Sequence, residues 1–176
     1  MKKLLLATLV LTASATSFAA DKDGTVTFNG KLVDNTCQVN TNSQNLTVQL
    51  PTLPTRQLAQ ANDTAGLTLF QIQLDSCDGQ KARAYFVPTP DKVDLTSGRL
   101  KTSTENGAAK NVQVQLVDSD ASRVINATGT GGNQGSELQE ITSSNNKLNY
   151  YARYYATGKT EAGTVKASVD YYVEYE

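Results

Sequence analysis

Side chains that commonly do chemistry are scarce in this 176-residue sequence. Histidine, the commonest general base and a common zinc ligand, does not occur. The carboxylates are scattered, and the spacing of Asp118 and Asp120 within a polar segment is more typical of a turn than of a catalytic pair. We therefore expect no catalytic residue, no metal site and no cofactor, and we expect that the protein is not an enzyme.

Cys37 and Cys77 are the two cysteines of the chain. An even number of cysteines in an exported protein predicts a disulfide bond between them. That bond closes a loop of about 40 residues, which is worth roughly 4 kcal/mol in the chain-entropy model. The alternative is a pair of free, buried thiols.

Residues 129–135, "GTGGNQG", have the glycine content of a phosphate-binding loop. They lack the Gly-Lys-Ser/Thr ending of that motif and the spacing of a dinucleotide-binding fingerprint, and no helix pattern follows them. We interpret the segment as a flexible loop.

The elements that must position these residues are mainly strands, because apolar and polar residues alternate along most segments. They cover residues 25–33, 46–50, 66–77, 83–87, 111–118, 147–157 and 165–176. Within 66–77 the apolar phase slips between Leu69 and Phe70, which predicts a bulge or bend. Residues 56–65 could form a helical turn. Short strands separated by polar turns predict an all-β, antiparallel sandwich of immunoglobulin-like type.

The first residues read as an export signal. "MKK" is a positive start, the apolar stretch after it is too short to span a bilayer, and Ser17 and Ala19 fit a signal-peptidase site. We expect a signal peptide over 1–19, the alternative being a retained membrane anchor. Loss of Lys2 and Lys3 changes the net charge from −1 to −3. Without a basic patch or a second long apolar run, neither nucleic acid nor a membrane-spanning segment is expected after cleavage.

Both ends of the expected mature chain carry clear period-two alternation. Residues 25–33 begin soon after the cleavage site, and residues 165–176 place apolar side chains on one face up to the penultimate residue. One interpretation is that both are edge strands of a complete sandwich. Edges this apolar would aggregate unless something covers them.

The mature sequence resembles the structural pilins of chaperone–usher, type 1-like fimbriae. The resemblance rests on "GTVTFNGKLVDNTC", on "FQIQLDSC" 40 residues on, on "LNYYARYYA", on Gly163 fourteenth from the end, and on a terminal strand with a penultimate Tyr. It implies an incomplete immunoglobulin-like β-sandwich over 35–176 that lacks its seventh strand. A donor strand supplied in trans would complete it.

The resemblance also implies roles for the two ends. Residues 20–34 would be the donor extension, with Val26, Phe28, Gly30 and Leu32 facing the groove of the next subunit. The wall of the acceptor groove, which also pairs with a chaperone, would comprise Gly163, Val165, Ala167, Val169, Tyr171, Val173 and Tyr175. Small Ala167 interrupts this otherwise bulky series.

The implied function is a structural subunit of an adhesive surface fimbria, which polymerises head-to-tail by donor-strand exchange. The implied partners are other pilin copies, a periplasmic chaperone and an outer-membrane usher, and the implied location is the cell surface after passage through the periplasm. Two alternatives stay open: a minor, tip or glycan-binding adhesin subunit, and a self-contained secreted immunoglobulin-like binding module.

Overall fold

The computed structural model describes residues 26–28, 30 and 37–176 of the chain. The chain divides into residues 1–34 and residues 35–176, and each part is considered by itself. The predicted signal peptide and Leu32 lie outside the described residues. The secondary structure comprises β1 (Gln38–Val39), α1 (Thr41–Gln44), the 3-10 helix η1 (Thr55–Leu58), β2 (Thr64–Asp75), β3 (Gln80–Phe86), β4 (Lys110–Val117), β5 (Val124–Ile125), the 3-10 helix η2 (Gly131–Gln134), β6 (Gln139–Ile141), β7 (Lys147–Glu161) and β8 (Tyr171–Tyr175).

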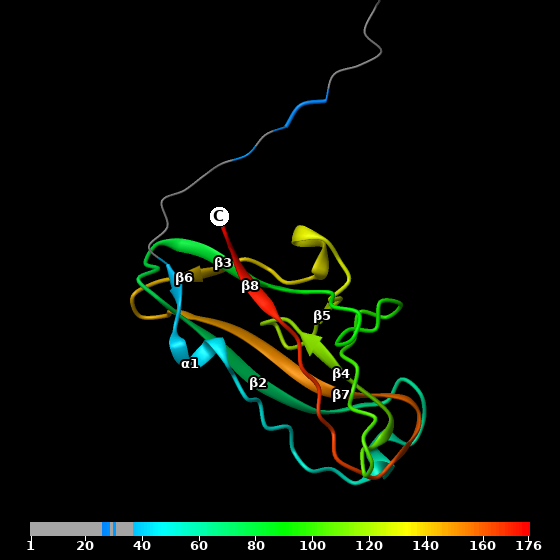
Figure 1. The fold of residues 1–176 in the computed structure, drawn as a ribbon. Helices are drawn as coiled ribbons and strands as arrows, with labels where there is room; N and C mark the ends of the chain where they lie inside the picture. Colours follow the sequence, from blue (N-terminus) through cyan, green and yellow to red (C-terminus); the bar gives the residue numbers. More distant parts are fainter. Residues whose placement is uncertain (1–25, 29, 31–36) are drawn as a thin grey trace, which may run out of the picture. The chain divides into compact units, whose positions relative to one another are not determined.

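The strands of residues 37–176 form two antiparallel sheets (Figure 1). One sheet has the order β1-β2-β7-β4-β5, and the other has the order β6-β3-β8. The long strand β7 pairs with β2 on one side and with β4 on the other. The predicted all-β, antiparallel sandwich is therefore confirmed.

The core lies between the sheets and is centred on Tyr150 of β7. Its ring packs edge-on against Phe86 of β3, with 5.5 Å between ring centroids. Its hydroxyl oxygen accepts a hydrogen bond of 2.7 Å from the backbone N–H of Ala84. Ala82 and Ala84 are both buried, and their small side chains leave room in β3 for this large ring. One buried tyrosine thus joins the two sheets by packing and by a hydrogen bond.

The predicted disulfide bond is present. Cys37 stands directly before β1 and Cys77 stands two residues after β2, and the two Cα atoms are 4.5 Å apart. Because β1 pairs with β2, the bond fastens the first strand of the domain to its neighbour.

Two predicted strand features are wrong. Residues 46–50 form no strand, because no segment within residues 37–176 offers them a backbone partner, and Pro51 and Pro54 follow closely. The bulge of β2 lies between Ala65 and Thr68 rather than at Leu69 and Phe70. Leu67 and Leu69 are exposed on the outer face, so the apparent slip in apolar phase reflects outward-facing leucines.

The predicted strand 165–176 is also shorter than expected, since β8 begins at Tyr171. Its partner β3 ends at Phe86, shortly before Pro88 and Pro90, so the ladder has no continuation. The helical turn predicted over 56–65 is limited to η1, because β2 already begins at Thr64.

The glycine-rich segment is not the free loop that its sequence predicts. It forms η2, whose last residue, Gln134, is buried. The side-chain amide of Gln134 accepts a hydrogen bond from the N–H of Phe86 and donates one to the C=O of Phe86. Gln134 thus takes the place of a strand partner at the end of β3. The turn predicted at Asp120 is confirmed, since its carboxylate accepts hydrogen bonds from the N–H groups of Ser122 and Arg123.

Candidate functional site

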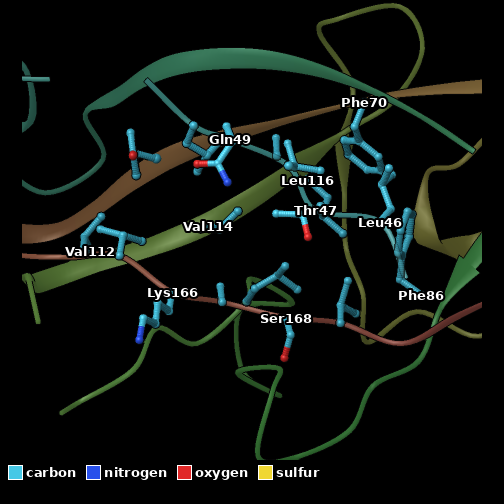
Figure 2. Close-up of a pocket in the computed structure, with 18 of the residues that line it drawn as sticks. Leu46, Thr47, Gln49, Phe70, Phe86, Val112, Val114, Leu116, Lys166 and Ser168 are labelled. Carbon is cyan, nitrogen blue, oxygen red and sulfur yellow. The ribbon is translucent and has the colours of Figure 1, made fainter. Parts of the chain in front are cut away.

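A long apolar groove of about 1780 Å³ lies within the sandwich. Its base is made of core side chains from both sheets, as Figure 2 shows for Phe86 of β3 and for Val114 and Leu116 of β4. The base comprises Phe70, Ile72, Phe86, Leu100, Val112, Val114, Leu116 and Ala152. A fold in which core residues line an open groove lacks the element that would cover them.

Two segments form the walls of this groove. We call residues 44–55 the N-terminal wall and residues 163–175 the C-terminal wall. In Figure 2, β4 with Val112 and Val114 lies between the segment of Thr47 and Gln49 and the segment of Lys166 and Ser168.

The last part of the C-terminal wall, Tyr171–Tyr175, is β8, which is the edge strand of its sheet. The hydrogen bonds from Val87 N–H to Asp170 C=O and from Glu176 N–H to Lys81 C=O show that the even-numbered residues bond to the β3 side. In an antiparallel pair the odd-numbered residues then direct their N–H and C=O groups to the other edge. That edge, at Tyr171, Val173 and Tyr175, is the one that faces the groove.

The first part of the C-terminal wall, residues 163–166, is supported by the loop of residues 103–109 instead of by a strand. Thr164 exchanges hydrogen bonds with Gly107 and Ala109, and the C=O of Lys166 accepts one from the N–H of Ser103. These bonds again lie on the outer side, so the inner side of the segment stays open.

The N-terminal wall is open as well. Within residues 37–176, no hydrogen bond joins Thr47, Val48 or Gln49 to another residue. The groove therefore has an unpaired backbone on both sides and an apolar base. This is the arrangement that accepts an extended strand by β-augmentation, with side chains of alternate residues in the base.

Gly163 is the first residue of the C-terminal wall. A Cβ atom added here would lie 2.4 Å from the backbone N of Ala109 and 2.5 Å from the backbone C of Ala108. Only glycine allows this close approach, which brings the wall against residues 107–109.

The other predicted wall residues lie as follows. Val165, Val169, Tyr171, Val173 and Tyr175 are partly buried and pack against the core, all on one face. Ala167 is exposed, although it also lines the groove. The Tyr171 and Tyr175 hydroxyls are neutral at physiological pH, and burial raises the pKa of both further above it. The wall thus brings no charge into the groove at these positions.

Val26, Phe28 and Gly30, the predicted donor residues that the structure describes, are all exposed. The sequence did not identify the N-terminal wall as part of the site, nor Leu100, which reaches the base from the loop before β4. An isolated leucine in a polar loop gives little signal. The run "LTVQL" gives a signal, but its alternation predicts a strand of the sandwich instead of a groove wall.

Other kinds of site find no support in the described residues. They contain no group of three His, Cys, Asp or Glu side chains that could hold a metal ion. None of the helices they form is long and apolar enough to cross a membrane.

Comparison with known proteins agrees with this geometry. A family model described as "Fimbrial protein" matches residues 26–176, which include the whole of the groove. The chain belongs to the fimbrial protein family. This family is one of structural proteins of fimbriae, which are surface fibres.

Fimbrial relatives match over the full length. The chain is 39% identical to the F17 fimbrial protein of Escherichia coli over 182 residues, with all of both chains covered. It is 36% identical to a major fimbrial subunit of Haemophilus influenzae over 212 residues, again with all of both covered. A chain in the structure of a chaperone-usher pilus shares the fold, with a TM-score of 0.59 at 19% identity, covering 88% of this chain and 96% of that one.

Proposed function

We propose that this fimbrial protein is the repeating structural subunit of an adhesive fimbria and that it polymerises by donor-strand exchange. Residues 20–34 of one copy would enter the groove of the next copy as the missing strand. The observation that carries the proposal is the groove itself, whose two unpaired backbone edges flank an open apolar base. The donor belongs to a different copy from the groove, so the contact does not close on itself and gives an open filament.

The donor segment has the side chains that such a groove requires. Val26 is 76% exposed and Phe28 is 89% exposed, which is unfavourable for apolar side chains in water. Burial of Val26, Phe28 and Leu32 at roughly 1.5–3 kcal/mol each would contribute about 5–9 kcal/mol. Each backbone hydrogen bond to the walls would add about 1 kcal/mol. The sum is consistent with a subunit contact that rarely dissociates.

The open groove also explains the proposed partners. A subunit with unpaired edges would aggregate during export, so a periplasmic chaperone would cover the groove until an outer-membrane usher exchanges it for the next subunit. The signal peptide over 1–19 would direct the chain to the periplasm, where the Cys37–Cys77 bond can form. The proposed role is structural, without catalysis.

Replacement of Gly30 by Val tests the proposal. An added Cβ at Gly30 meets no atom within 4 Å in its own chain, so the variant should fold and bind the chaperone normally. In a neighbour's groove, the larger side chain would overpack a constricted position, which typically costs about 1–3 kcal/mol. We expect normal amounts of chaperone complex, measured by co-purification, and few or no fibres in electron micrographs of the cell surface.

Thr27→Val is the matched control. Thr27 is exposed and lies on the opposite face of the alternating pattern, and the change places the same valine side chain there in place of a β-branched residue of similar size. Fibres should form normally in this variant. Fibres of normal yield from Gly30→Val would contradict the donor role of this segment. A stable wild-type monomer on gel filtration, with an ordered N-terminus and no fibres, would favour the self-contained binding module instead.

A further inference from the structure

The two faces of the C-terminal wall make different contacts. Odd-numbered residues face the groove, and even-numbered side chains face away from it, as Figure 2 shows for Lys166 and Ser168. Most of the even-numbered residues have a partner on the outer face. The pairs are Lys166–Glu105 at 3.8 Å, Asp170–Lys92 at 2.6 Å, Glu174–Arg83 at 2.8 Å and the stacked rings of Tyr172 and Tyr85.

The middle of the C-terminal wall lacks the hydrogen bonds that support its two ends. Lys166 bonds to the loop below, and the ladder with β3 begins at Asp170. Between them, Ala167, Ser168 and Val169 form no hydrogen bond within residues 37–176. This stretch nevertheless lines the groove at its centre and must be extended to pair with an incoming strand.

Lys92 supports the wall at Asp170, the residue that directly follows this stretch without hydrogen bonds. Its Nζ lies 2.6 Å from both carboxylate oxygens of Asp170, whose C=O also accepts the hydrogen bond from Val87. Lys92 is itself held, because its C=O accepts from the N–H of Lys101 and the next residue, Val93, is buried in the core. The pair therefore connects the wall to a firmly packed loop.

We propose that Lys92 is a positioning residue of the groove: through Asp170 it holds residues 167–169 extended for an incoming strand. This inference rests on the proposed function. The Lys92 side chain is 30% exposed and that of Asp170 is 58% exposed, and pairs this exposed contribute little to the stability of a fold. Their effect should appear instead in strand capture, because an incoming strand would otherwise have to order the wall as it binds.

The test compares capture of a labelled synthetic peptide with the sequence of residues 20–34, in exchange for the chaperone, by variants of the chain purified as chaperone complexes. We expect Lys92→Met to capture the peptide about tenfold more slowly than wild type, with a melting temperature close to that of wild type. Lys92→Arg should restore most of the rate, and so should the exchanged pair Lys92→Asp with Asp170→Lys. Lys110→Met is the matched control, because it removes a similar ion pair, with Glu161, from a residue outside the wall.

Capture by Lys92→Met at the wild-type rate would overturn the inference, while wild-type capture itself would uphold the proposed function. A slow rate in both Lys92→Met and Lys110→Met would overturn it too, since general loss of charge would then explain the effect. Failure of the wild-type chain to capture the peptide would overturn the proposed function and this inference with it.

Discussion

At the scale of single residues, the fold depends on small side chains where backbones approach and on a few buried polar groups. Gly163 lets the C-terminal wall contact residues 107–109, and Ala84 leaves room for Tyr150. Among the described residues, Asp118 is the buried polar residue whose side chain is not fully hydrogen-bonded. It is buried, its Oδ2 accepts a hydrogen bond of 3.3 Å from the N–H of Glu137, and its Oδ1 has no partner among the described residues.

Burial raises the pKa of the Asp118 carboxyl above its usual value of 3.8, and hydrogen bonds and Arg123 only partly oppose this. A carboxyl whose pKa is higher in the folded state binds its proton more tightly there. The stability it contributes is therefore fully present below pH 3.8 and is lost as the pH rises through the higher folded pKa.

Asp118→Asn, which cannot ionise, should remove this dependence. We expect the free energy of unfolding of wild type, relative to the variant, to fall as the pH rises from below 3.8 to neutral. Urea unfolding of both proteins over that range measures the difference. A difference independent of pH would show that Asp118 does not titrate as its burial requires.

At the scale of elements, the sequence was most informative where a strand has a partner along its whole length. The strands predicted at 83–87, 111–118 and 147–157 correspond to β3, β4 and β7. The strand predicted at 46–50 is absent, and the strand predicted at 165–176 is present only from Tyr171 onward, although both segments have the right alternation. Alternation describes which side chains are buried, but a ladder also needs a neighbouring backbone, and both segments border the open groove. These two errors of strand prediction thus fall on the walls of the site.

The odd and even faces of β8 should respond differently to charge. Replacing Val173 and Tyr175 with Asp places charges on the face that packs against the core, which costs several kcal/mol. We expect this double variant to lose chaperone binding and to be degraded in the periplasm. Tyr172→Asp, on the outer face, is the control and should lose only its stacking with Tyr85. Normal periplasmic levels of the double variant, still bound to chaperone, would contradict the role of this face.

At the scale of the whole molecule, the proposed contact joins an exposed apolar segment near one end of one copy to an unfilled groove beside the other end of the next copy. Composition and alternation were sufficient to predict the all-β class and the disulfide. The groove could not be predicted from these patterns, because an open groove and a filled core use the same apolar residues, such as Val114 and Leu116. Only the arrangement of the unpaired edges distinguishes them.

Cross-linking within assembled fibres tests this central claim most directly. A photoreactive amino acid at position 28, in fibres grown from a mixture of light and isotopically heavy copies, reports which residues surround that side chain. We predict links between different copies, to groove residues such as Leu116 or Val169. Links within one copy, or links to the outer face of the five-stranded sheet, would contradict it.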